Sequence, residues 1–142
     1  MTEILMPVRL SDAIVGALQA RYTLHRLWEA KDQQAFMDDI APRIDAIVTA
    51  GAILAHGMSF TTSDAVMARL PKLRYIANHG VGYDTVDAAA AVARGIMVTN
   101  TPDVLTDETA DTAFGLVLNT VREFPAAERY LREGEWAKGP YR

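Results

Sequence analysis

Cysteine is absent from the 142-residue chain, which excludes disulfides and thiolate sites, whether catalytic or metal-binding. A chain without disulfides is compatible with the reducing cytoplasm, where we expect this protein to act. Apolar runs are short, and none approaches the roughly 18 residues of a membrane span. The N-terminal segment carries Glu3 and no basic stretch, so it does not resemble a signal peptide.

Basic residues are also scarce: 14 lysines and arginines stand against 18 acidic residues, for a formal charge of −4. They form no stripe, so nucleic acids and anionic membranes are poor partners. The three histidines have no metal-ligand spacing, and no Gly-x-Ser-x-Gly elbow is present. What remains is an ordinary globular composition, with 50% hydrophobic and 23% charged residues.

Short apolar runs alternate with helix-period segments along the first 101 residues. The pattern predicts a parallel sheet with helices on both faces, which is a flavodoxin-like, doubly wound α/β fold with five strands. Expected helix signals include an N-cap at Ser11 or Asp12, an N-cap at Ser63 and a glycine stop at Gly95. The expected strands are Ile4–Val8, Tyr22–Leu27, Asp45–Ala50, Leu73–Asn78 and Ile96–Thr99.

After Thr101 the alternation stops, and the pattern predicts a C-terminal helical extension over residues 102–142. A long helix is expected from Thr106 to Arg122, with Thr106 as its N-cap. A second helix follows from about Pro125 to Arg132, and we expect no regular structure in the tail from Glu135 onward.

The strongest local signal is the pair Gly80 and Gly82 directly after the fourth strand, where ligands bind in such sheets. The sequence is compatible with two interpretations: a structural turn, or a loop whose main-chain amides bind an anion. A dinucleotide fingerprint is rejected, because Thr85 occupies the third glycine position. Asp103, at the distance expected for the ribose-binding acid, follows a proline in a loop rather than ending a strand.

Histidines and acids near this edge have simpler explanations. His56 lies in the loop after the third strand, at the edge expected for a site, although a lone loop histidine is more often a surface residue. The same holds for His79, and His25 within a strand is expected to be structural. The acids Asp103, Asp107, Glu108 and Asp111 suit the first turns of a helix, so a catalytic carboxylate pair is disfavoured.

Two segments, Leu73–Asp84 and Arg94–Asp111, resemble the D-isomer-specific 2-hydroxyacid dehydrogenases, and most closely the glyoxylate/hydroxypyruvate reductases. The similarity runs from about Leu73 to Gly139, whereas residues 1–72 fit the family in pattern only. The resemblance implies that residues 1–101 form the substrate domain. Residues 102–142 would be an interdomain helix and an arm that buries Trp136 in a homodimer.

The resemblance also implies site roles. The amides of Val81 and Gly82, next to Gly80, would bind the carboxylate of a small 2-oxo acid. The loop that contains His56 would border the substrate, and Thr106 would touch the nicotinamide cofactor, NAD or NADP.

The family's nucleotide-binding Rossmann domain, with its glycine fingerprint and its catalytic Arg, Glu and His, has no counterpart here. We therefore expect no catalytic residue and no metal ligand in this chain, and no activity from it alone. As a whole the protein would reduce glyoxylate or hydroxypyruvate to the D-2-hydroxy acid by hydride transfer from NAD(P)H. The alternative is a stand-alone flavodoxin-like module that binds a small acid or a protein without catalysis.

Overall fold

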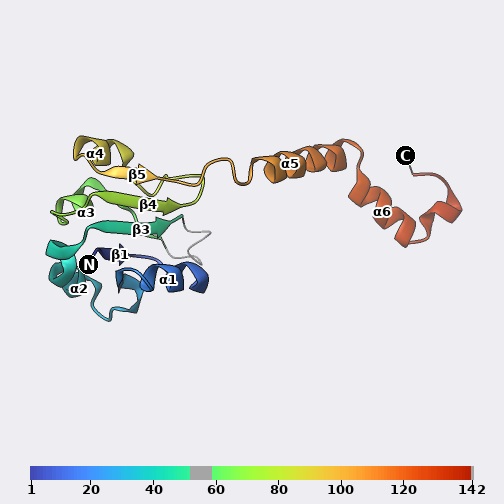
Figure 1. The fold of residues 1–142 in the computed structure, drawn as a ribbon. Helices are drawn as coiled ribbons and strands as arrows, with labels where there is room; N and C mark the ends of the chain where they lie inside the picture. Colours follow the sequence, from blue (N-terminus) through green and yellow to red (C-terminus); the bar gives the residue numbers. More distant parts are fainter. Residues whose placement is uncertain (52–58, 142) are drawn as a thin grey trace. The chain divides into compact units, whose positions relative to one another are not determined.

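The computed structural model describes residues 1–51 and 59–141, which form two compact units, Met1–Pro102 and Asp103–Arg142. The first unit contains a five-stranded sheet in the order β2-β1-β3-β4-β5, with every neighbouring pair parallel (Figure 1). This order confirms the flavodoxin-like prediction. The strands are β1 (Glu3–Met6), β2 (Thr23–Arg26), β3 (Ala46–Ala50), β4 (Tyr75–His79) and β5 (Met97–Thr99).

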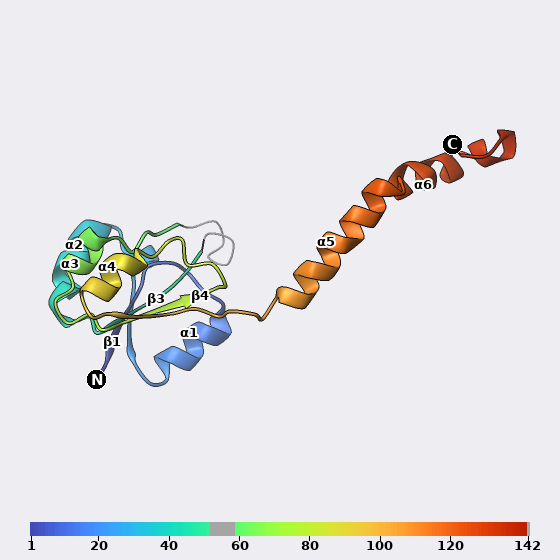
Figure 2. The same cartoon turned by 90° about the horizontal axis from the view of Figure 1, so that it is seen from above.

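The helices of this unit lie on both faces of the sheet (Figure 2). One core joins α2, α3 and α4 to the sheet through side chains such as Leu5, Ile47 and Ile76, which are fully buried. The opposite core joins α1 to β1 and β3 around Met6 and Ala50. The helices are α1 (Asp12–Gln19), α2 (Gln33–Ile40), α3 (Asp64–Ala68) and α4 (Ala88–Ala93), with 3-10 turns η1 (Leu27–Glu29) and η2 (Ala41–Arg43).

The sheet face that packs against α1 is only partly covered by helices in the described part of this unit. Burial alternates along β4, where Ile76 is buried while Tyr75 is 47% exposed. Met97, its register partner on β5, is 58% exposed. Apolar side chains therefore reach the surface at β4 and β5 in the described part of this unit.

Helix caps follow the sequence prediction at some ends and not at others. Ser63 caps α3 by accepting from Val66 N at 3.4 Å, as expected. Ser11 occupies the N-cap position of α1, but its side chain makes no capping hydrogen bond, and Asp12 is already the first helical residue.

The predicted cap at Thr106 is wrong. Thr106 is the first residue of α5 (Thr106–Val121), and Leu105 is its N-cap, without a side-chain bond. The chain enters this helix through a tight turn in which Asp103 has φ +64° and accepts from Thr106 N at 3.4 Å. This backbone turn replaces the side-chain cap that the sequence suggested.

The second unit contains α5, α6 (Phe124–Arg132) and the 3-10 helix η3 (Glu135–Lys138). The tail is thus regular where no structure was expected. Gly134, with φ +73°, ends α6 and turns the chain back. The hydroxyl of Tyr130 then donates to Gly139 O at 2.7 Å, and the Tyr130 and Tyr141 rings meet edge to face at 5.5 Å. The tail is therefore fixed to α6.

Candidate functional site

The site begins where β4 ends. Asn78 and His79 are its last residues, and His79 pairs in register with Ala50, the last residue of β3. Gly80 follows with φ +152°, a conformation that residues with a side chain rarely adopt. Gly80 is thus required for the direction in which the chain leaves the sheet.

Three carbonyls of the glycine loop, residues 80–82, accept hydrogen bonds from the ends of the two adjacent strands, β4 and β5. Asn78 Nδ2 donates to Gly82 O at 2.9 Å and lies 3.4 Å from Gly80 O. Thr101 N also donates to Gly80 O, at 3.0 Å. Asn100 Nδ2 donates to Val81 O at 2.8 Å. The carbonyls of residues 80, 81 and 82 are therefore all held by the protein itself.

Peptide geometry then determines where the amides point. In a trans peptide, the C=O of one residue and the N–H of the next point in opposite directions, and no described peptide bond is cis. Holding the Gly80 carbonyl turns Val81 N–H away from Asn78 and Thr101, and holding the Val81 carbonyl turns Gly82 N–H away from Asn100. Val81 and Gly82 are both exposed residues, so the loop that carries these amides lies at the surface. This arrangement suits an anionic ligand.

Gly82 has a different requirement from Gly80. Its φ is not in the positive region. A Cβ atom at this position would lie 3.1 Å from Oδ2 of Asp84, closer than an ordinary contact. Position 82 therefore favours glycine because a side chain would crowd Asp84, whereas position 80 favours glycine because of its positive φ.

Buried polar atoms gather at the same edge of the sheet. Thr49 Oγ1, Asn78 Oδ1 and His79 Nδ1 have no hydrogen-bond partner among the described residues. Thr62 Oγ1, in the Thr62–Val86 bridge, and Thr85 Oγ1, one residue before Val86, also have no hydrogen-bond partner among the described residues. Buried polar atoms are normally paired, so this edge is suited to polar partners such as water or a ligand.

The other predicted site residues, His56 and Thr106, are not tested by the structure. His56 lies outside the described residues. Thr106 belongs to the second unit, at the start of α5, and its contact with a cofactor stays a prediction. Within the described ranges no cluster of three or more His, Cys, Asp or Glu side chains is placed to hold a metal.

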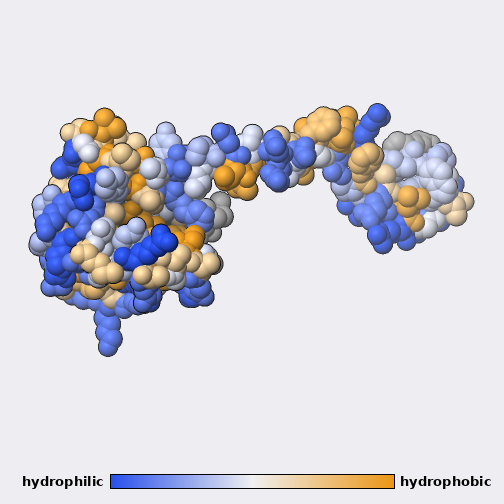
Figure 3. Space-filling view, in the orientation of Figure 1, coloured by the Kyte–Doolittle hydropathy of each residue, from blue (hydrophilic) through white to orange (hydrophobic). Residues whose placement is uncertain are grey.

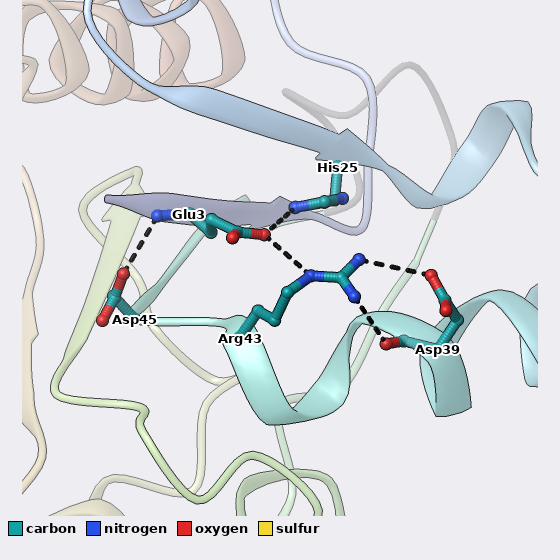
Figure 4. Close-up of polar contacts among 5 residues, drawn as sticks. All are labelled: Glu3, His25, Asp39, Arg43 and Asp45. Atoms are coloured by element: carbon teal, nitrogen blue, oxygen red, sulfur yellow. Dashed lines mark hydrogen bonds and ion pairs between the residues drawn. The ribbon is translucent and has the colours of Figure 1, made fainter. Parts of the chain in front are cut away.

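His25 lies in a separate polar network at the start of β1 (Figure 4). Its Nε2 is 2.7 Å from Glu3 Oε2, and Arg43 Nε donates to the same oxygen at 3.2 Å. Arg43 also pairs with Asp39 at 3.2 Å, and Glu3 N donates to Asp45 at 3.0 Å. The hydrogen bond from His25 lowers the pKa of Glu3 below its ordinary value, and Arg43 adds to the effect. The network joins β1, β2 and η2, away from the glycine loop.

Sequence reasoning identified the glycines but missed Asn78 and Asn100, which hold the loop. A signal was present, because each is a carboxamide within one residue of the end of a neighbouring parallel strand. Such side chains meet at one edge of the sheet.

Comparison with known proteins places this arrangement in a family. Residues 4–133 match the family model described as D-isomer specific 2-hydroxyacid dehydrogenase, catalytic domain. The glyoxylate reductase of Pyrococcus horikoshii is 48% identical over 95 residues, which are 67% of this chain and 26% of that protein. A glyoxylate/hydroxypyruvate reductase of Arabidopsis thaliana is 32% identical over 139 residues, 97% of this chain and 42% of the relative.

Solved structures of similar proteins have the same fold. A 2-hydroxyacid dehydrogenase from Ketogulonicigenium vulgare Y25 superposes with a TM-score of 0.81 at 41% identity, over 100% of this chain and 43% of the other. An NADPH-dependent glyoxylate/hydroxypyruvate reductase from Sinorhizobium meliloti, in complex with citrate, gives 0.70 at 35% identity, over 100% and 42%. The chain thus spans less than half the length of these relatives. On the family match, the glycine loop and the sheet order together, the chain belongs to the D-isomer specific 2-hydroxyacid dehydrogenases, as part of their catalytic domain.

Proposed function

We propose that this chain is the substrate-binding part of a cytoplasmic reductase that converts glyoxylate or hydroxypyruvate to the D-2-hydroxy acid with NADH or NADPH. The observation that carries the proposal is the anchored loop, whose carbonyls are bonded inward so that the amides of Val81 and Gly82 face away. Two such amides suit the carboxylate that every 2-oxo acid carries. The names of the relatives supply the substrate class.

The glycine loop does not fit the nucleotide itself. After Gly82 the chain passes through Thr85 and the Thr62–Val86 bridge before α4 begins. A dinucleotide site instead needs a glycine turn that runs directly into a helix N-terminus. The nicotinamide cofactor would supply the hydride when bound, and Thr106 is the residue of this chain proposed to contact it.

The chain's own contribution to the reaction is then to bind and orient the acid. None of its described residues is assigned a proton transfer, and we propose that the 142-residue chain has no reductase activity by itself. The experiment pairs an activity assay with a binding assay. The purified chain is mixed with glyoxylate or hydroxypyruvate and NADH or NADPH, and absorbance is followed at the wavelength of the reduced nicotinamide.

We expect no oxidation above the blank, whereas glycolate, the reduced form of glyoxylate, shifts the Val81 and Gly82 amide signals in a ¹H–¹⁵N NMR titration. Glycolamide, which has no carboxylate, is the matched control and should not shift them. Oxidation of NADH or NADPH by the 142-residue chain would contradict the proposal that it has no reductase activity by itself. A longer reading frame that binds glycolate and has no reductase activity would favour the non-catalytic binding module.

We also propose a homodimer formed through the second unit. Phe114, Val117 and Val121 recur at helical spacing on α5 and are 65%, 56% and 72% exposed, and Trp136 is 59% exposed. Hydrophobic residues are visible at the surface of this unit (Figure 3). Large exposed apolar surfaces of this kind mark interaction sites.

Light scattering tests the dimer. We expect twice the monomer mass for the complete protein and the monomer mass for Val117→Asp. Thr112→Asp, on the opposite side of α5, is the control and should remain dimeric. Monomers at every concentration of the unmodified complete protein would remove the proposal.

A further inference from the structure

We propose that Asn78 and Asn100 are positioning residues for the substrate carboxylate, each of which sets the direction of one amide donor. The inference rests on the proposed function, since it concerns the same anion. Neither side chain needs to touch the ligand, because each acts through a peptide group that it holds by its carbonyl oxygen.

Asn78 is the inner of the two. It is 3% exposed on β4, and its carboxamide nitrogen serves both Gly80 O and Gly82 O. The opposite amide orientation would place Oδ1 against two carbonyl oxygens, so the hydrogen-bond network determines the assignment. By holding these two carbonyls, Asn78 directs the N–H groups of Val81 and Tyr83 away from the core.

Asn100 is the outer of the two and follows β5. Its Nδ2 donates a hydrogen bond to Val81 O, 19 residues earlier in the chain, at 2.8 Å. The next residue, Thr101, donates its N–H to Gly80 O at 3.0 Å. The segment after β5 thus supports the loop after β4, because the two strands are register neighbours. Holding the Val81 carbonyl directs the Gly82 N–H away from Asn100.

The two asparagines therefore act on different amides. Asn78, with the Thr101 amide, orients Val81 N–H, and Asn100 orients Gly82 N–H. A hydrogen bond accepted by a peptide carbonyl also polarises its N–H and makes it a better donor. A general stabilising role would not produce this residue-by-residue correspondence, so the correspondence is the feature to test.

The test uses the 142-residue chain, glycolate as the probe and three variants: Asn78→Ala, Asn100→Ala and Asn119→Ala. Alanine avoids adding charge near an anion site. Asn119 is the matched control, because its Nδ2 donates to Gly115 O, another glycine carbonyl, at 2.8 Å on α5. Binding is measured by the ¹H–¹⁵N titration, and folding by the same spectra.

We expect Asn100→Ala to weaken glycolate binding about tenfold, the effect of one lost charge-assisted hydrogen bond, and to reduce the shift of Gly82 more than that of Val81. Asn78→Ala should reduce the shift of Val81 instead, and Asn119→Ala should match the unmodified chain. If Asn78→Ala does not fold, Asn100→Ala decides the question, since Asn100 is partly exposed.

The possible failures are distinguishable. If glycolate shifts the loop amides equally in the unmodified chain, Asn78→Ala and Asn100→Ala, the positioning role is overturned and the carboxylate site stands. If the unmodified chain shows no shift at Val81 or Gly82, the carboxylate site is overturned, and the positioning role with it.

Discussion

Replacing glycine by alanine at three positions should have three different effects on stability. At Gly80, φ is +152°, so alanine should cost about 1–3 kcal/mol of unfolding free energy through backbone strain. At Gly82, φ is not positive and the new Cβ would meet only Asp84 Oδ2 at 3.1 Å. That oxygen is the end of an exposed, flexible side chain, so the expected cost is below about 0.5 kcal/mol.

Gly16 completes the series with the opposite sign. It lies inside α1, its φ is not positive, and nothing lies within 4 Å of a Cβ built there. Alanine should stabilise the first unit by about 0.5–1 kcal/mol, because glycine in a helix loses more conformational entropy on folding.

Urea unfolding measures all three. Trp136 belongs to the second unit, so Trp136→Phe is the background, and the fluorescence of Trp28 then reports the first unit, where its ring packs beside the α1 core. Midpoints are compared at a common slope.

We expect the order Gly16→Ala, unmodified chain, Gly82→Ala and Gly80→Ala, from most to least stable. Gly82→Ala should nonetheless bind glycolate more weakly than the unmodified chain, because its methyl group lies beside the amide proposed to bind the carboxylate. If Gly82→Ala destabilises as much as Gly80→Ala, or if Gly80→Ala costs nothing, the distinction between a conformational and a spatial glycine is wrong.

Three further predictions concern the core, the acid range and the alkaline range. Ile76→Ala should cost about 2–5 kcal/mol in the same urea assay, because Ile76 is 0% exposed between the sheet and its helices. Glu3→Gln should lower the unfolding midpoint at neutral pH. The His25 hydrogen bond lowers the Glu3 pKa, so the stability that ionised Glu3 contributes is fully present above its ordinary pKa of 4.5. This stability is lost as the pH falls through the folded-state pKa, so the midpoints of Glu3→Gln and the unmodified chain, measured from about pH 7 downward, should converge in acid. Tyr141→Phe should remove from the ultraviolet titration an ionisation that lies above pH 10.0, because the hydrogen bond to Glu123 raises the Tyr141 pKa; loss of an ionisation centred at or below pH 10.0 would contradict that contact.

The sheet was predictable because each strand contains a short apolar run and the runs are separated by glycine, proline and helix-period segments, even though burial alternates along β4. Ala46–Ala50 lies within the run predicted for it, and its neighbours begin or end within two residues of their predicted bounds. A capped helix was predictable where the cap is local, as at Ser63, whose side chain reaches an amide three residues ahead.

Features that come from backbone turns or from partners far along the chain were not predictable in this way. The pattern gives a threonine before an acidic first turn, but the turn at Asp103 places Leu105, not Thr106, at the helix boundary. The tail appeared irregular because its order comes from Tyr130 and Tyr141, which contact Gly139 and Glu123. In the site, the bond from Asn100 to Val81 spans 19 positions, and no local pattern specifies it.

The chemistry of the proposed ligand, a 2-oxo acid, limits what the loop can contribute to the proposed reaction. During hydride transfer to a 2-oxo acid, charge develops on the carbonyl oxygen, while the carboxylate keeps its charge throughout. Amides that hold the carboxylate therefore bind the substrate and the transition state alike, and their loss should appear mainly in KM. This agrees with the architecture of the loop, in which glycines and two asparagines set the direction of main-chain donors, and none of the residues assigned to it needs to exchange a proton.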